Sequence, residues 1–234
     1  MTLEELIASG LPKSVWFDLD NTFYPYEIAN NAGMAAAYEK LNKLFSISHA
    51  DAESLFAEAR KQIKKLLDGT GASHSRLLYF QRLLELMGLK TQPSLVLDLE
   101  QTFWRAYLQN AVLFEGVEDF LYKLRSKDIV TAIVTDLTAQ IQMRKLIYFG
   151  LDGLIDFIVT SEEVGADKPN KRIYEVAAQK TGFTGKDVWM IGDDIAKDIK
   201  AAQEFGVYTL LKTDKDTNTD IPYFTDFVNL ARQL

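Results

Sequence analysis

Two aspartates, Asp18 and Asp20, directly follow the short apolar run at residues 15–17. A run of this kind predicts a buried strand, and aspartate is a poor strand residue. Chemistry therefore explains the position of these side chains better than packing does. One carboxylate can act as a nucleophile toward a phosphoryl group, and a second can protonate a leaving group and then activate water.

Polar residues also follow three later apolar runs, either directly or through a short loop. They are Thr135 and Asp136, Lys168, and Asp193 and Asp194. Ligands of open parallel sheets bind beyond the carboxyl ends of the strands. We therefore expect these groups to gather around Asp18 and Asp20. Asp136 taken alone is explained more simply as a helix cap, whereas polar groups at so many strand ends together indicate a site.

The expected cluster is rich in carboxylates, which are Asp18, Asp20, Asp193 and Asp194. Ionised carboxylates do not crowd together without a cation, and a set of oxygen ligands suits Mg²⁺, which also bridges to phosphate oxygens. A lysine and a hydroxyl, here Lys168 and Thr135, can hold phosphoryl oxygens and offset their charge. The sequence therefore predicts a Mg²⁺ site built for phosphoryl chemistry.

The elements that must position these residues follow from periodicity. After residue 114, strand-like apolar runs at 129–134, 157–160, 188–191 and 207–211 alternate with helical patterns. Such alternation predicts a parallel sheet with helices on both faces. The run at 14–17 has no strand partner nearby and is expected to join this sheet. The predicted fold class is α/β, with a Rossmann-like parallel sheet core, and residues 213–220 are expected to form a polar loop.

Residues 24–111 have a different character. They are rich in Ala, Leu, Lys, Glu and Gln, and their apolar residues recur at helical spacing. This pattern predicts an all-helical bundle of about four helices. We therefore expect a core of residues 1–23 and 112–234, with residues 24–111 inserted into it as a helical cap domain.

Composition excludes several classes of function. The net charge of -7 and the pI near 5.0 argue against a nucleic-acid partner. The chain has no cysteine and only two histidines, which excludes disulfides, thiolate metal sites and a histidine-rich zinc cluster. No segment resembles a secretory signal or a membrane span. We expect a cytoplasmic protein that acts on a small phosphorylated metabolite; its oligomeric state is left open.

The motifs resemble those of the haloacid dehalogenase (HAD) superfamily. The segment FDLDNT at residues 17–22 resembles the first motif of that superfamily, and the order and strand-end context of the other three also agree. The later motifs are Thr135 for the second, Lys168 with Pro169 for the third, and Gly192, Asp193 and Asp194 with Asp198 for the fourth. The insert resembles the helical type 1 cap. The segment FYPY at 23–26 is most similar to a group that includes pyrimidine 5′-nucleotidases.

The resemblance implies a role for each matched residue. Asp18 is the nucleophile and a Mg²⁺ ligand, and Asp20 is the general acid and base, which also offers its backbone carbonyl to the metal. Thr135 binds the phosphoryl group, and Lys168 steadies the nucleophile and the phosphate. Asp193 is the other carboxylate ligand of the metal.

Other positions leave alternatives open. Asp194 is implied as a carboxylate of the metal site or just outside it, and Asp198 either reaches the same site or orients the loop. Asp136 stands where the superfamily often has Asn. It either binds a sugar or base hydroxyl of the substrate or caps the helix that begins at Leu137, and we favour the helix-capping role. Tyr24 either stacks on a nucleobase or packs at the hinge.

The presence of Asp20 separates the branches of the superfamily, because a halide leaving group needs no proton whereas an alkoxide does. The favoured function is therefore a Mg²⁺-dependent phosphatase of small phosphomonoesters, with nucleoside 5′-monophosphates as one candidate class. A phosphomutase or other phosphotransferase on the same core is an alternative, and a non-enzymatic binding module is another. In the cap, His49 and His74 are candidate site residues, and Arg76 is a candidate contact for an anionic substrate.

Overall fold

The computed structural model describes residues 2–215 and 221–234. Contacts divide the chain into two units, a core of Met1–Pro25 and Val112–Leu234 and a cap of Tyr26–Ala111. The first junction thus lies after Pro25, slightly later than the sequence suggested. Among the described residues, no helix has the length and apolar character needed to cross a membrane. Part of the polar loop expected at 213–220 lies outside the described residues.

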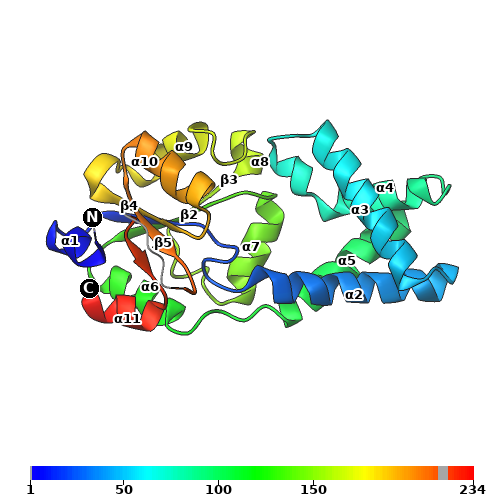
Figure 1. The fold of residues 1–234 in the computed structure, drawn as a ribbon, viewed down its shortest axis with the longest axis horizontal. Helices are drawn as coiled ribbons and strands as arrows, with labels where there is room; N and C mark the ends of the chain where they lie inside the picture. The colour runs from blue at the N-terminus through cyan, green and yellow to red at the C-terminus, as the bar shows by residue number, and fades with distance from the viewer. Residues whose placement is uncertain (1, 216–220) are drawn as a thin grey trace. The chain divides into compact units, whose positions relative to one another are not determined.

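The described strands of the core form one six-stranded parallel sheet in the order β3-β2-β1-β4-β5-β6 (Figure 1). The strands are β1 (Ser14–Phe17), β2 (Val130–Thr135), β3 (Phe157–Thr160), β4 (Val188–Gly192), β5 (Tyr208–Lys212) and β6 (Tyr223–Phe224). The first strand lies inside the sheet, and its Phe17 is in register with Ile133 of β2 and Ile191 of β4. The chain therefore leaves these three strands at one common edge.

Helices cover both faces of the sheet. In Figure 1, α9 (Arg172–Thr181) and α10 (Ala201–Phe205) lie on one face, and α6 (Val117–Ser126) and α11 (Phe227–Gln233) lie on the other. The remaining helical elements of the core are α1 (Leu3–Ala8), α7 (Ala139–Tyr148), α8 (Ser161–Val164), η2 (Gly185–Asp187) and the π-helical turn η3 (Ile195–Lys200). This arrangement confirms the predicted α/β fold with a parallel sheet.

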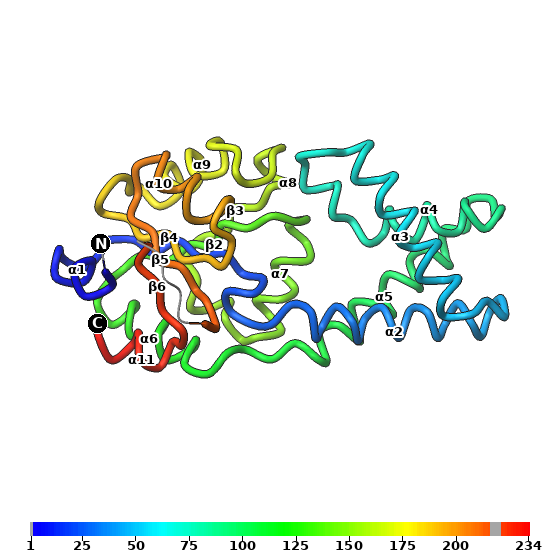
Figure 2. The backbone as a smooth tube through the Cα atoms, in the orientation of Figure 1, coloured from blue at the N-terminus to red at the C-terminus, as the bar shows by residue number. Residues whose placement is uncertain are grey.

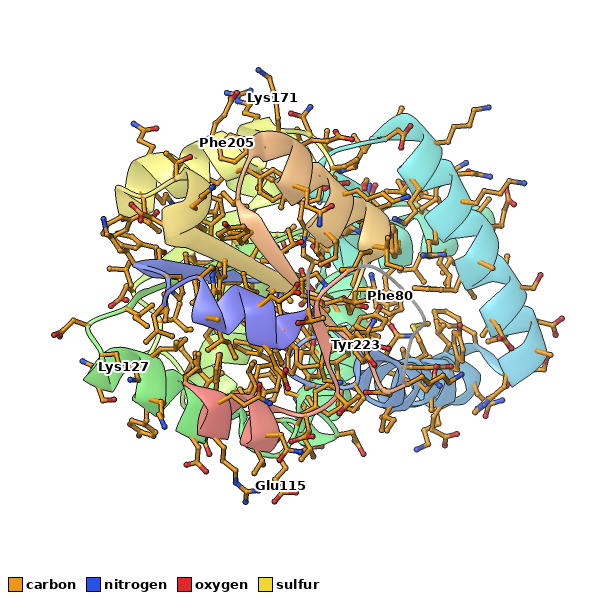
Figure 3. The ribbon with its side chains drawn as sticks, turned by 60° about the vertical axis from the view of Figure 1, so that its left-hand side comes forward. Phe80, Glu115, Lys127, Lys171, Phe205 and Tyr223 are labelled. Carbon is orange, nitrogen blue, oxygen red and sulfur yellow. The ribbon has the colours of Figure 1, made fainter. Side chains whose placement is uncertain are left out.

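The apolar core explains why the strands are continuous apolar runs. Trp16, Val134 and Met190 of the sheet are buried against Ile173 and Ala177 of α9. A sheet covered on both faces buries both sides of each strand, so alternation with polar residues is absent. Charged side chains such as that of Lys171, just before α9, extend outward instead (Figure 3).

Among the described residues, the core elements that were not predicted from the sequence are α8, η2, β6 and α11. The helix α8 occupies part of the expected loop after β3, and β6 and α11 follow the polar segment near the C-terminus. These elements are short, and short elements carry little periodic signal. The helix α1 begins with a capping box between Thr2 and Glu5.

The cap is built from helices that pack on one another. They are α2 (Tyr26–Phe45), α3 (His49–Leu66), α4 (Arg76–Leu86) and α5 (Pro93–Gln109), with the short 3₁₀ turn η1 (Gly71–His74) before α4. The helices α2 and α5 are far apart in the sequence and lie side by side (Figure 2). A Cβ atom on Gly33 of α2 would lie 2.7 Å from the Phe103 ring of α5. Glycine at this position therefore permits the close approach of the two helices.

We expect the substitution Gly33→Val to lower the free energy of unfolding by about 1–3 kcal/mol, because the new side chain overpacks the contact with Phe103. Urea denaturation followed by circular dichroism measures the change. The matched control is Ala35→Val, which places the same β-branched side chain at an exposed position of α2 and should change the value by less than about 1 kcal/mol. Equal stability of the two variants would contradict the packing argument.

Candidate active site

A buried lysine joins three strand ends of the core. The ammonium of Lys168 donates to Asp18 Oδ1 at 2.6 Å, to Asp198 Oδ1 at 2.7 Å and to the carbonyl oxygen of Val134 at 3.1 Å. Asp18 directly follows β1, and its amide continues the sheet by donating to the carbonyl of Ile191 at 2.9 Å. The sequence-predicted residues Asp18 and Lys168 are therefore brought together as an ion pair with little exposure.

Three carboxylates form a group that suits a divalent cation. Oxygen atoms of Asp18, Asp193 and Asp198 all lie within 4.8 Å of one another. Gly192 makes this possible, because a Cβ atom there would collide with the carboxylate of Asp198. Oxygen ligands from carboxylates at such a spacing fit Mg²⁺, so these residues are able to hold the metal that the sequence suggested.

Asp194 lies outside this group. Its Oδ1 accepts hydrogen bonds from the amides of Ala196 at 2.8 Å and Lys197 at 3.0 Å, and so caps the N-terminus of η3. The sequence left open whether Asp194 or Asp198 belongs to the metal site. In the structure it is the side chain of Asp198, one turn later, that joins the carboxylate cluster. Its Oδ2 also accepts from the amide of Asp194 at 3.0 Å, which fixes its orientation.

Burial and crowding shift the acid–base properties of the cluster. Burial raises the pKa of Asp18 well above its usual value, Lys168 opposes that shift, and Asp198 and Asp193 reinforce it. Burial also raises the pKa of Asp193 to about 6, with a further contribution from Asp198. Burial disfavours the charge of Lys168, but Asp18 and Asp198 outweigh it and raise the pKa of the ammonium. The cluster thus carries more negative charge than Lys168 balances, as expected of a cation site.

The second carboxylate of the first motif is held separately. Lys145 of α7 donates to the two carboxylate oxygens of Asp20 at 2.6 and 2.9 Å, and the hydroxyl of Tyr24 also donates to Asp20. The side chain of Lys145 is 1% exposed, whereas that of Asp20 is 22% exposed. Two donors therefore orient a carboxylate that is still open to solvent.

Two residues of the site, Lys145 and Gln142, were not predicted from the sequence. Both lie on the buried side of α7, between Ile141 and Leu146. Gln142 donates from Nε2 to Thr135 Oγ1 at 2.7 Å and so orients the hydroxyl predicted to bind a phosphoryl group. A signal was present, because two polar residues at a spacing of three interrupt the apolar stripe of a predicted helix.

Tyr24 and Asp136, two candidate substrate contacts, interact with other parts of the protein instead. The ring of Tyr24 is fully buried and lies 5.0 Å from the ring of Phe149. Asp136 accepts a hydrogen bond from the Lys168 amide at 2.8 Å and pairs with Lys197 at 3.0 Å. The favoured interpretation of Asp136 as a cap was wrong, because α7 begins at Ala139 with Thr138 in the capping position. Asp136 instead ties the loop that carries Lys168 to the end of β2.

The three candidate site residues of the cap domain differ in burial. Arg76, the first residue of α4, is buried, whereas the side chain of His49 at the start of α3 is 55% exposed and lies 3.4 Å from Glu39. His74 in η1 is half-buried, with its ring nitrogen 3.4 Å from the ammonium of Lys64.

We expect Mg²⁺ binding to weaken as the pH falls through about 6, the value to which the pKa of Asp193 is raised. Below that value a proton occupies Asp193 and competes with the metal, so the apparent Kd should rise by up to about tenfold per pH unit. Calorimetric titration of the protein with Mg²⁺ between about pH 5 and pH 7.5 measures this dependence. An affinity independent of pH across this range would exclude Asp193 as a ligand.

Comparisons with known proteins agree with this geometry. The chain is 37% identical over 221 residues to the ribulose-1,5-bisphosphate 5-phosphatase of Halopiger xanaduensis, covering 94% of this chain and 92% of that protein. It is 25% identical over 202 residues to the pyrimidine 5′-nucleotidase PynA of Streptococcus pneumoniae, covering 85% and 82%. The solved structure of a HAD phosphatase from Thermococcus onnurineus has the same fold, with a TM-score of 0.71 at 21% identity over 94% of this chain and 96% of that one.

The family match extends over both units of the chain. Residues 12–206 match the haloacid dehalogenase-like hydrolases. This range contains all four groups of strand-end residues and the whole of the cap. The chain therefore belongs to the haloacid dehalogenase-like hydrolase family.

Proposed function

We propose that the protein is a Mg²⁺-dependent phosphatase that hydrolyses small phosphomonoesters through an aspartyl phosphate. The observation that carries this proposal is the division between the two carboxylates of one loop. Asp18 lies in the cluster with Lys168 at 2.6 Å, whereas Asp20 is held apart by Lys145 at 2.6 Å. A phosphatase needs a nucleophile and a separate proton carrier, and this arrangement supplies both.

In the first step, a carboxylate oxygen of Asp18 attacks the phosphorus and the ester P–O bond breaks. Asp20 gives its proton to the leaving alkoxide. In the second step, Asp20 takes a proton from water, the water oxygen attacks the phosphorus, and the bond to Asp18 breaks to release inorganic phosphate. The chain is thereby restored, and no other reactant is consumed.

The surrounding residues support these steps. Lys168 offsets the charge of the transferred group, and the Thr135 hydroxyl, which accepts from Gln142 at 2.7 Å, contacts phosphoryl oxygens of the substrate. Mg²⁺ bound by Asp18, Asp193 and Asp198 would neutralise charge on the phosphoryl group and on the carboxylates. Lys145 and Tyr24 hold Asp20 as a hydrogen-bond acceptor, the state in which it takes a proton from water.

Sugar phosphates are the substrate class that we favour over nucleotides. The relative named for a sugar bisphosphate shares 37% identity with this chain, against 25% for the relative named as a nucleotidase. The buried ring of Tyr24 also offers no surface for stacking on a base. Phosphate release over a matched panel of sugar phosphates and nucleoside monophosphates with Mg²⁺ tests this preference, and faster turnover of the nucleotides would reverse it.

We expect Asp18→Asn to reduce phosphate release from p-nitrophenyl phosphate by at least about a thousandfold, because the amide is a poor nucleophile. The circular dichroism spectrum should be unchanged. The control is Asp187→Asn, the same change at a carboxylate that is 49% exposed and paired with Lys13; it should keep full activity. Retention of more than a few per cent of the rate by Asp18→Asn would overturn the assignment of the nucleophile.

We expect Lys145→Met to lower kcat by about tenfold or more, with little change in KM, because Asp20 loses the group that positions it. The loss should be greater for alkyl phosphates than for p-nitrophenyl phosphate, whose leaving group needs little protonation. Lys145→Arg should recover part of the rate, and Lys171→Met, at a side chain that is 80% exposed, serves as the control. An equal loss for both ester types would indicate that Lys145 acts on the fold rather than through Asp20.

A further inference from the structure

The cap contains a pocket of its own between α2 and α3. Its volume is about 650 Å³, and every residue that lines it belongs to the cap. Cavities of this size hold small molecules in other proteins. The lining is polar at the end formed by Tyr26, Asn30 and Arg76 and apolar at Met34 and Phe56. A ligand with one charged end and a carbon body fits such a lining.

Arg76 is the unusual group of this pocket. It is 8% exposed, and a fully buried arginine normally has a charged partner. Its Nη1 donates to the carbonyl of His74 at 3.2 Å, and its Nη2 donates to Asn30 Oδ1 at 3.2 Å and to the hydroxyl of Tyr26. None of these acceptors carries a charge.

The Nε atom of Arg76 is buried and has no hydrogen-bond partner among the described residues. Leaving such a donor unsatisfied destabilises the folded protein, and more so when the group is charged. The guanidinium also lies 5.2 Å from the ring centre of Phe103 and 5.4 Å from that of Tyr79, so its plane is held in place. A fixed guanidinium that has an unsatisfied donor, and no counter-ion within the part of the chain that the structure describes, is suited to an oxyanion.

The remaining charges of the lining favour an anion. Arg60 of α3 adds a second guanidinium to the lining, whereas Glu53 is the one carboxylate among the lining residues, all of which are described. Glu53 acts on the phenol of Tyr38, whose pKa is raised by burial first and by this carboxylate second. With its arginines and Glu53 ionised, the lining has an excess of positive charge.

We propose that this pocket binds the oxyanion group of a small metabolite, a phosphate or a carboxylate, through the guanidinium of Arg76, with Arg60 as a second cation. Met34 and Phe56 pack against the carbon body. The anion is either an additional charged group of the enzyme's substrate or a separate anion that modulates the enzyme. The first source rests on the proposed phosphatase function; binding itself does not.

Nuclear magnetic resonance of the full-length, ¹⁵N-labelled protein tests binding without turnover. The probes are inorganic phosphate and ribulose 1,5-bisphosphate, with ribose as the uncharged control. We expect the anions, but not ribose, to shift the Nε–H resonance of Arg76 and the side-chain amide of Asn30 in a saturable manner. If the Arg76 resonance stays in place while core resonances such as that of Thr135 move to saturation, the proposal fails.

A second variant keeps the test independent of Arg76, whose loss also removes a partner of Tyr26 and Asn30. Ala57 is an exposed lining residue of α3, so Ala57→Trp fills the pocket and leaves the arginine in place. We expect it to weaken anion binding in the cap by about tenfold or more, because the indole occupies the space that the ligand needs. Ser54→Trp, at an exposed position of α3 outside the lining, is the control. Equal binding by the Ala57→Trp variant and the native protein would overturn the proposal.

Kinetics then separates the two sources of the anion. If the pocket holds part of the substrate, Ala57→Trp raises KM for ribulose 1,5-bisphosphate by a larger factor than KM for p-nitrophenyl phosphate. If it holds a separate anion, sulfate changes the rate of p-nitrophenyl phosphate hydrolysis in the native protein more than in the variant. Either result supports an anion site in the cap. A protein with no phosphatase activity would refute the proposed function while the binding experiment still decides on the pocket.

Discussion

The ammonium of Lys168 lies between Asp18 and Asp198, and the geometry of the core site depends on this contact. The distances of 2.6 and 2.7 Å bring two buried carboxylates together around a single positive charge. Without that charge, burial and mutual repulsion would protonate the carboxylates or drive them apart. The loop that carries Lys168 is in turn held at the end of β2 by Asp136, which accepts from its amide at 2.8 Å. One charge therefore organises three segments that are distant in the sequence.

The separation of Asp18 from Asp20 depends on the backbone that follows. Asn21 has φ of 62°, a left-handed conformation that asparagine tolerates better than most residues. The chain then turns back, so that the amide of Phe23 donates to the carbonyl of Leu19 at 3.0 Å and Asp20 forms a bridge with Tyr24. The turn directs the second carboxylate away from the cluster toward Lys145. A nucleophile and a proton carrier are thus separated within a single short loop.

The cap is held together mainly by apolar packing rather than by buried ion pairs. The side chains on the facing surfaces of its helices are mostly apolar and aromatic, and the ring of Phe80 contacts those of Phe56 and Phe103. Within this packing Arg76 is buried, held by neutral acceptors and by the faces of aromatic rings. The guanidinium lies 5.2 Å from the ring centre of Phe103, the same ring that packs against Gly33.

The sequence by itself determined the parallel sheet, the inserted helical unit and the grouping of Asp18, Thr135, Lys168 and Asp193 at one edge. These follow from local periodicity and from the rule that parallel strands end together. Only the tertiary structure decided that Asp198 rather than Asp194 joins the carboxylate cluster, and that Lys145 holds Asp20. The contact between Lys145 and Asp20 spans 125 positions. The reason is physical: a period of hydrophobicity reports which side of an element is buried, whereas the partner of a buried polar group is set by the packing of elements that are far apart in the chain.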